Sequence, residues 1–244
     1  MSHVYRFCGI RTGQLSWVLE EEEHFHALKV LRLTSGSEIE IADGKGWTSR
    51  AIITSVGKST CTFDIHEESY AERLSNGPEI IIALGATKPQ SCDEFLPSLV
   101  ELGVDEIVIF SSESGDKYRM SEKIQERCDR IIKSACKQCK RPWFPRLVWA
   151  ESVQEVVELF ASHDNSSKFV LDPDGSDYSP TRTRPVRTIL AVIGSEKGFT
   201  LSELSKLDQA GFERIRIGSF ILRTVTAAIA ATSIFAQSRV ETLR

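Results

Sequence analysis

The sequence has little glycine, proline or net charge for its length, and these shortages exclude several classes of protein. Fifteen glycines and eight prolines among 244 residues are too few for a collagen or a low-complexity chain. A formal net charge of -4 together with 41% hydrophobic residues is unlike an intrinsically disordered chain, which is more charged and less apolar. We therefore expect a folded protein.

Long hydrophobic runs are also missing. The longest apolar candidate, Glu79 to Ala86, has the length of a strand and falls short of the roughly 20 residues of a membrane-spanning helix. Residues 1–14 contain no basic segment followed by the continuous apolar stretch of a secretory signal. These absences predict a cytoplasmic protein with no membrane partner.

Cysteine and basic charge are limited as well. The six cysteines are too few and too scattered for a disulfide framework, so we expect reduced thiols. Cys136 and Cys139 have CxxC spacing without a second pair, and His24 and His26 lack a third ligand cluster, so we predict no metal site. A pI of about 5.8 disfavours binding of nucleic acid through bulk charge, although it leaves room for local basic clusters.

The pattern changes character near Gly77-Pro78, which favours two domains. In residues 1–74, alternating apolar residues predict strands, and a glycine-rich turn begins at Asp43. Before these strands, one segment has apolar residues at the spacing of a helix. The segment is typical of a small β-barrel with one short helix. The expected helix is His24–Leu33, and the clearest strands are Glu38–Ala42, Trp47–Val56 and Thr60–Ile65.

Residues 75–244 alternate between strands and helices, which predicts an α/β domain with a mainly parallel sheet covered on both faces. Residues 172–187 are dense in turn formers and are expected to form a surface loop. The expected strands are Glu79–Leu84, Glu106–Phe110, Phe169–Leu171, Ile189–Ile193 and Arg214–Ile217. The expected helices are Asp93–Leu102, a long helix capped by Ser121, Leu201–Ala210 capped by Thr200, and Thr224–Val240.

The last of these helices is rich in small residues. Its spacing predicts one face formed by Val225, Ile229, Thr232, Ala236 and Val240. Small side chains permit close packing against another helix of the same subunit or of a second copy, and an ordinary buried helix fits the spacing equally well.

Three of the predicted strands end at a glycine, namely Gly85, Gly194 and Gly218. Ligands of open α/β sheets bind beyond the carboxyl ends of the strands, and a glycine there lets a ligand approach the backbone. Each glycine taken singly is also explained by a tight turn. The segment that begins at Gly194 fits neither GxxxxGK[ST] nor GxGxxG, which disfavours nucleoside triphosphate hydrolysis.

Two segments carry a resemblance to a known family. Ile193-Gly-Ser-Glu-Lys-Gly-Phe199, and Gly218 followed by Ile221-Leu-Arg-Thr-Val-Thr-Ala227, resemble the signature segments of the RsmE family. These are SPOUT methyltransferases that act on uracil N3 of a uridine in small-subunit (16S) ribosomal RNA. Other positions similar to the family are His26, Val30 to Arg32, Asp43-Gly44, Glu101 to Val104, Arg127, Ala135, Gln138, Arg141 and Pro145.

The resemblance implies a fold that periodicity does not reveal. It implies a PUA-like, RNA-binding β-barrel in residues 1–74, followed in residues 75–244 by a SPOUT methyltransferase domain with a C-terminal trefoil knot. It also implies a homodimer that binds S-adenosylmethionine and acts on the small ribosomal subunit. The residues implied to hold this cofactor are Leu84, Gly85, Gly194, Gly198, Ile217, Gly218 and Leu222.

Methylation of uracil N3 requires loss of a proton and attack on the methyl group. We hypothesise that Arg223 stabilises charge on the uracil or fixes a phosphate, and that Glu196 shapes the loop or accepts a proton. A structural ion pair for Arg223 and a capping or solvated carboxylate for Glu196 are the alternatives. The predicted RNA-binding residues, each also explained as a solvated surface charge, are Arg32, Lys137, Lys140, Arg141, Arg146, Arg182, Arg184 and Arg187.

Several positions differ from the residue usual in the family. They are Ser98, Ser114, Ser195, Lys197 and Val225, and the run Lys137-Gln138-Cys139. Ser98, Ser195, Lys197 and Val225 motivate one alternative function, a non-catalytic RNA-binding dimer that retains the fold. A methyltransferase acting on another RNA position is a further alternative.

Overall fold

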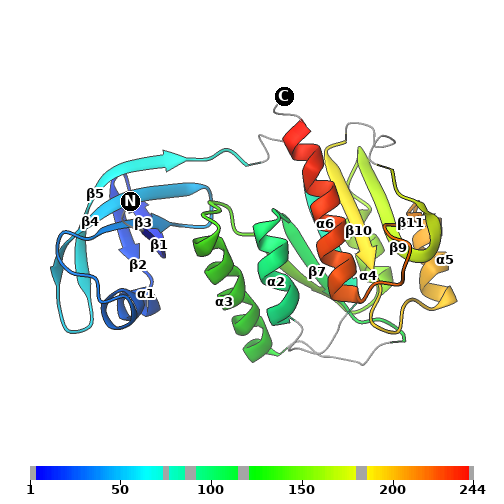
Figure 1. The fold of residues 1–244 in the computed structure, drawn as a ribbon, viewed down its shortest axis with the longest axis horizontal. Coiled ribbons are helices and arrows are strands. Elements are labelled where there is room, and N and C mark those ends of the chain that lie inside the picture. Colours follow the sequence, from blue (N-terminus) through cyan, green and yellow to red (C-terminus); the bar gives the residue numbers. More distant parts are fainter. Residues whose placement is uncertain (1–3, 74–76, 86–91, 115–120, 180–185, 242–244) are drawn as a thin grey trace. The chain divides into compact units, whose positions relative to one another are not determined.

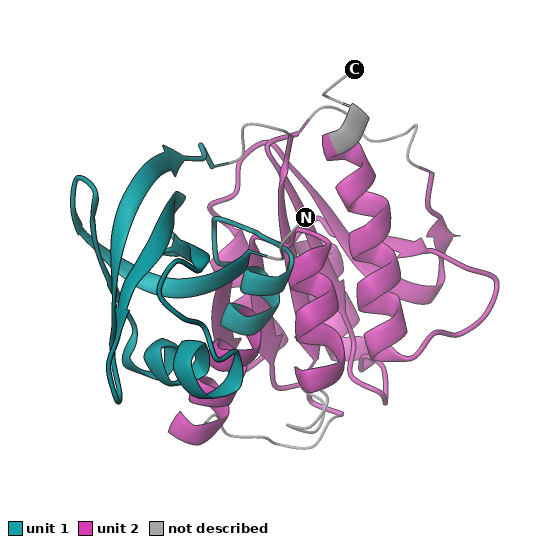
Figure 2. Ribbon diagram, turned by 60° about the vertical axis from the view of Figure 1, so that its left-hand side comes forward, with its two compact units in different colours: residues 1–73, 133–144 teal, residues 74–132, 145–244 magenta. Residues whose placement is uncertain are grey.

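A computed structural model describes residues 4–73, 77–85, 92–114, 121–179 and 186–241. The chain divides into two compact units (Figure 2). Unit 1 contains Met1–Arg73 and Lys133–Phe144, and unit 2 contains Leu74–Ile132 and Pro145–Arg244. The sequence pattern does not predict that residues 133–144 join the first unit.

Unit 1 is built on a five-stranded sheet in the order β2-β1-β3-β4-β5. Its strands are β1 (Tyr5–Gly13), β2 (Ser16–Leu19), β3 (Glu38–Ala42), β4 (Trp47–Val56) and β5 (Cys61–Tyr70). Alternate residues such as Ile39 and Ile41 are fully buried in its core. The sheet is a half-barrel rather than the predicted barrel, because β2 and β5 remain edges of the hydrogen-bonded order. Glu68 of β5 instead accepts side-chain hydrogen bonds from Arg11 of β1 and Trp17 of β2.

The predicted helix of unit 1 begins and ends three residues earlier than expected and is partly irregular. It consists of α1 (Glu21–Phe25) and a π-helical turn, η1 (His26–Val30). Ala27 is the buried residue of this turn, whereas Phe25 and Val30 are exposed.

Ion pairs hold residues 133–144 within unit 1. Lys133 binds Glu20 at 2.6 Å, Lys137 binds Glu23 at 2.6 Å, and Lys140 binds Glu40 at 2.6 Å. The indole nitrogen of Trp143 donates to the Ala71 carbonyl at 2.7 Å. These partners lie about a hundred residues apart in sequence, which is why local patterns do not reveal the association.

Unit 2 contains a six-stranded sheet in the order β11-β9-β10-β6-β7-β8, and every neighbouring pair is parallel (Figure 1). The predicted parallel sheet is therefore confirmed. Its central strands are buried on both faces, as Ile80 to Ala83 illustrate at 0% exposure. The strands are β6 (Glu79–Gly85), β7 (Glu106–Phe110), β8 (Arg146–Ala150), β9 (Ser166–Asp177), β10 (Thr188–Ile193) and β11 (Glu213–Arg216).

Helices cover both faces of this sheet. α2 (Cys92–Glu101) and α6 (Thr224–Glu241) contact each other, and α6 lies against β6 and β10. α4 (Val153–Phe160) and α5 (Leu201–Gln209) also contact each other, and a second apolar cluster around Phe110, Phe160 and Leu190 lies between them and the sheet. A fifth helix, α3 (Glu122–Gln138), begins after Ser121 as predicted. No helix in the described ranges is long and apolar enough to cross a membrane.

Three parts of unit 2 differ from the sequence prediction. β8 and α4 were not predicted, and residues 172–177, predicted as a loop, continue strand β9. The buried face of α6 is also different from the predicted one. Thr232 is buried as predicted, but Val225, Ile229 and Ala236 are only partly buried, and the side chain of Val240 lies outside the described residues. The other buried residues of the helix are Ala227, Ala228, Ala231 and Phe235. Alanines fill this face because the helix packs closely on the sheet.

Candidate functional site

A cavity in unit 2 lies at the carboxyl ends of β10 and β11 and beside the middle of β9. Its volume is about 780 Å³. Four stretches of chain line it together with Leu201, Leu204 and Ala227. These stretches are residues 171–174, 193–199 without Lys197, 214–218, and 220–224. This is the edge of a parallel sheet at which ligands bind.

The structure brings most of the predicted cofactor residues to this cavity. Those that line it are Gly194, Gly198, Ile217, Gly218 and Leu222. Leu84 and Gly85 do not line it. Gly85 lies behind the cavity wall, because a Cβ atom at this position would collide with the Ser195 amide nitrogen. Two of the three glycine-ended turns therefore face the cavity, and the third supports one of them.

Gly218 differs from the other two glycines. An added Cβ atom at Gly194 would lie 3.1 Å from the Phe199 ring, so packing within the protein explains this glycine. An added Cβ atom at Gly218 would meet nothing within 4 Å. Packing does not require a glycine there, and its missing side chain leaves room in the cavity.

The turn between β10 and α5 accommodates the residues that differ from the family. The left-handed backbone conformation falls on Gly198, with φ of +71°, and not on Lys197. The Gly198 amide donates to the Ser195 carbonyl at 2.8 Å, which closes the turn. Lys197 therefore takes an ordinary backbone conformation and imposes no strain of the kind that a left-handed residue with a side chain would carry.

A buried hydrogen bond joins the two signature segments. The Thr224 hydroxyl donates to the Gly194 carbonyl at 3.0 Å, and Thr224 is buried at the first position of α6. This contact fixes the start of α6 against the end of β10. It thereby places the neighbouring Arg223 at the cavity.

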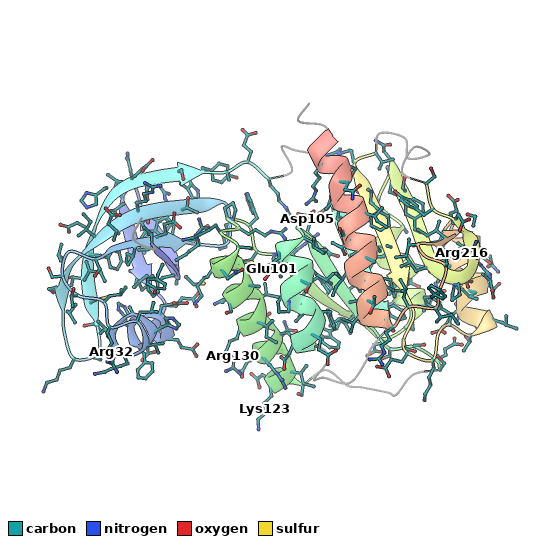
Figure 3. The ribbon with its side chains drawn as sticks, viewed as in Figure 1. Arg32, Glu101, Asp105, Lys123, Arg130 and Arg216 are labelled. Atoms are coloured by element: carbon teal, nitrogen blue, oxygen red, sulfur yellow. The ribbon has the colours of Figure 1, made fainter. Side chains whose placement is uncertain are left out.

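Both predicted catalytic residues line this cavity and both are exposed. The side chains of Arg223 and Glu196 have no hydrogen-bond or ion-pair partner in the part of the chain that the structure describes. The other two arginines of the cavity are paired: Arg214 binds Asp208 and Asp172, and Arg216, labelled beside β11 in Figure 3, binds Asp177 at 2.8 Å. The geometry thus gives no support to a structural ion pair for Arg223.

A buried carboxylate that sequence reasoning missed supports the same turn. Glu203 is 0% exposed, and its Oε1 accepts hydrogen bonds from the Ser112 hydroxyl at 3.0 Å and the Glu113 amide at 2.9 Å. Its Oε2 accepts from the Thr200 amide at 2.7 Å, which completes a capping box with the predicted N-cap Thr200. The spacing of Thr200 and Glu203 is the sequence signal that could have identified this residue.

The loop after β7, which contains Ser112 to Ser114, makes three further contacts. The Ser114 hydroxyl donates to the Gly198 carbonyl at 2.9 Å. The Glu113 carboxylate binds Lys206 at 2.9 Å and accepts from the Thr200 hydroxyl, and the bond from Lys206 holds the pKa of Glu113 below its ordinary value. The cavity turn is therefore held from the carboxyl end of β7 as well as from β10.

The predicted RNA-binding residues have different surroundings. Lys137 and Lys140 are engaged with Glu23 and Glu40 of unit 1. Burial alone would raise the pKa of Glu40, but the hydrogen bond from Lys140 and the charge of Arg6 hold it below its ordinary value. Arg32 is exposed, has a φ of +53°, and has no partner among the described residues, and Arg141 is half-buried. Arg182 and Arg184 lie outside the described residues.

The thiols and the candidate metal ligands form neither a disulfide nor a metal site among the described residues. All six cysteines are free, and five of them are buried. Burial raises the pKa of Cys136 to about 12, so the CxxC pair contains an unreactive core thiol. Among the described residues, no group of three or more His, Cys, Asp and Glu side chains could hold a metal ion.

Comparisons with known proteins agree with this architecture. Residues 75–236 match the family described as an RNA methyltransferase domain, and residues 19–65 match the RNA methyltransferase PUA domain. The chain is 28% identical to the ribosomal RNA small subunit methyltransferase E of Buchnera aphidicola subsp. Acyrthosiphon pisum, over 88% of this chain and 85% of that protein. The corresponding protein of Buchnera aphidicola subsp. Schizaphis graminum is also 28% identical, over 83% and 82% of the two chains.

A solved structure is similar over nearly the whole chain. It is the ribosomal RNA small subunit methyltransferase E of Neisseria gonorrhoeae bound to S-adenosyl methionine. Its TM-score is 0.82 at 26% identity, and the similarity covers 96% of this chain and 98% of that one. The chain therefore belongs to the RNA methyltransferase family, and within it to the RsmE family that its signature segments resemble.

Proposed function

We propose that this protein transfers a methyl group from S-adenosylmethionine to uracil N3 of a specific uridine in 16S ribosomal RNA, in the cytoplasm. Membership of the RNA methyltransferase family and the names of the similar proteins support the reaction class. The observation that carries the proposal is Arg223, an arginine without a protein partner among the described residues, at the mouth of a cavity formed by both signature segments.

The residues of the cavity fit the proposed cofactor. The volume of about 780 Å³ is within the range of small-molecule sites, and Gly218 leaves space that the protein does not fill. Gly194, Gly198, Ile217 and Leu222 would hold the cofactor together with Gly218, while Leu84 and Gly85 support the wall behind them. When bound, the cofactor supplies an electrophilic methyl group.

The protein's part in the reaction is to prepare the uracil. The N3 proton must leave before the nitrogen attacks, and the resulting anion spreads onto the neighbouring carbonyl oxygens. Arg223 donates hydrogen bonds to this charge, which lowers the free energy of the transition state. Glu196 is exposed, lines the cavity and has no partner among the described residues, so its carboxylate is free to accept the N3 proton.

The remaining parts of the chain bind RNA and form the contacts between two copies of the protein. The half-barrel of residues 1–74 binds the ribosomal RNA together with basic side chains, and the exposed Arg32 contributes more than the ion-paired Lys137 and Lys140. Arg141, Arg182 and Arg184 are the other proposed RNA-binding residues. The protein forms a homodimer: Phe220 and Ile221 are 86% and 82% exposed beside a partly buried apolar stripe of α6, and a second copy would cover them. The resemblance in both signature segments supports a trefoil knot in residues 75–244.

The residues that differ from the family leave the cavity open, which disfavours the non-catalytic alternative. Lys197 does not line the cavity, and Ser195 is buried in the turn that Gly198 closes. Ser98 and Val225 are partly buried in α2 and α6.

Methyl transfer to purified small subunits tests the proposal. With radiolabelled S-adenosylmethionine, the parent protein should label 16S ribosomal RNA, and mass spectrometry should place the methyl group on N3 of one uridine. Arg223→Ala should reduce turnover about 100-fold or more while cofactor binding measured by calorimetry stays near the parent value. Arg130→Ala on the exposed face of α3 is the matched control and should leave turnover unchanged. Parent-like turnover of Arg223→Ala would remove this residue from the mechanism.

A further inference from the structure

Strand β9 leaves its sheet at the cavity and then returns to it. Its ladder with β10 ends where Leu171 faces Ile193. On its other side β9 pairs with β11, where Val170 faces Arg214 and Ser176 faces Ile215. Arg214 and Ile215 are consecutive, so residues 171–175 of β9 have no pairing partner in β11. Such irregularities redirect side chains next to functional sites. Here the excursion directs Asp172, Pro173 and Asp174 to the cavity.

Asp172 is the buried member of this group. Its side chain is 10% exposed, and it lies one residue beyond the carboxyl end of the β9–β10 ladder. Its Oδ1 accepts a hydrogen bond from the Asp174 amide at 3.0 Å. Its Oδ2 accepts one long bond, at 3.4 Å, from the guanidinium of Arg214.

Arg214 is committed mainly to a different carboxylate. It donates from Nε to Asp208 at 2.9 Å and binds the same carboxylate a second time through Nη2. This bidentate geometry is the stronger form of an arginine–carboxylate pair. One guanidinium is thus shared between Asp172 and Asp208, and the group of three side chains carries one negative charge in excess.

A buried carboxylate with a single distant cation is costly, because burial removes most of its hydration. A positively charged ligand group in the cavity would restore a close partner. S-adenosylmethionine, the cofactor of the proposed function, has two such groups, the sulfonium and the α-ammonium. Its product after transfer, S-adenosylhomocysteine, keeps the ammonium and has lost the sulfonium charge.

We propose that Asp172 binds a positively charged group of the methyl donor and so selects charged donors over neutral adenosine thioethers. This inference rests on the proposed function, because it assumes that the cavity holds S-adenosylmethionine. It adds a ligand-binding residue from β9 to the two signature segments.

Calorimetry with three ligands on the full-length Asp172→Asn protein tests the inference. Affinity for S-adenosylmethionine should fall tenfold or more, since hydrogen bonds to charged groups contribute on this scale. Affinity for methylthioadenosine, which has neither the sulfonium nor the α-ammonium, should stay within twofold of the parent value. An equal loss for S-adenosylhomocysteine assigns the contact to the ammonium, whereas a loss confined to S-adenosylmethionine assigns it to the sulfonium.

Two further variants separate charge from folding. Asp208 lies outside the cavity lining, and the Asp208→Asn substitution frees Arg214 to bind Asp172 fully. This variant should therefore also bind S-adenosylmethionine more weakly, while its affinity for methylthioadenosine stays near the parent value. Asp129→Asn makes an equal change of charge on α3 and should alter the affinity for neither ligand. Parent-like affinity of Asp172→Asn for S-adenosylmethionine, or equal losses for methylthioadenosine, would overturn the inference. Absence of S-adenosylmethionine binding by the parent protein would instead overturn the proposed function.

Discussion

Replacing Glu203 by glutamine tests how the cavity turn is held. The carboxylate of Glu203 accepts three hydrogen bonds while fully buried, two at Oε1 and one at Oε2. Glutamine keeps one acceptor oxygen for Ser112 and Glu113, but its amide group faces the Thr200 N–H, which is also a donor. One charge-assisted hydrogen bond is lost and a buried donor is left unsatisfied, at a cost of about 2–3 kcal/mol.

Thermal unfolding measures this cost. For a domain of this size, 1 kcal/mol lowers the midpoint by about 2–4 °C, so Glu203→Gln should lower it by roughly 5–10 °C. Guanidinium unfolding followed by circular dichroism should show the same loss in free energy. Affinity for S-adenosylmethionine should fall as well, because the bond to Thr200 fixes the turn that lines the cavity.

A matched control lies at the start of α4. Glu155 is three residues after the N-cap Ser152 and accepts a hydrogen bond from the Glu151 amide, as Glu203 does from Thr200. It is more exposed, so Glu155→Gln should cost less than about 1 kcal/mol. If Glu203→Gln unfolded within 2 °C of the parent protein, or at the same temperature as Glu155→Gln, the reasoning about a buried anchor would be refuted.

Three further predictions follow from other contacts. Gly85→Ala should destabilise the protein by about 1–3 kcal/mol, because the added Cβ atom collides with the Ser195 backbone. Gly218→Ala should unfold like the parent protein but bind S-adenosylmethionine more weakly. Thermal unfolding and calorimetry of both variants measure these effects. Arg239→Met removes the guanidinium that binds the buried Asp105, labelled in Figure 3, and the carbonyls of Pro78 and Gly103, and denaturant unfolding should show a loss of about 3–5 kcal/mol. The pKa of Glu40 is lowered in the folded protein, so the stabilisation by its carboxylate is present above about pH 4.3 and disappears as the pH falls through the lowered value. Glu40→Gln should therefore reduce the loss of stability with falling pH in this range of an acid unfolding curve, and an unchanged curve would contradict the assignment.

The sequence predicted the central strands because their character is local. Glu79–Leu84 and Ile189–Ile193 are continuous apolar runs between turn signals, and a parallel sheet buried on both faces requires such runs. The capping residue Thr200 was likewise visible in the sequence. Both signature segments were identified, and the structure brings them to one cavity.

The misses have physical causes. Arg146–Ala150 was not predicted as a strand because only Ala150 is buried in it, and the Ser152–Glu155 capping signal of α4 was overlooked. Asp172 to Gly175 have the composition of a turn, yet the chain returns to pair with β11, and Gly175 permits the close approach of the Arg214 backbone. Asp172 could not be identified as a cavity residue from sequence, since its position depends on this excursion.

The central claim is that the cavity beside Gly194 and Gly218 serves methylation of uracil N3 in 16S ribosomal RNA. Mass spectrometry of ribosomal RNA from cells lacking the protein tests it most directly. We predict that one N3-methyluridine is missing from the 16S RNA, returns when the parent protein is supplied, and stays missing with Arg223→Ala. A full complement of this nucleotide in cells without the protein would contradict the account.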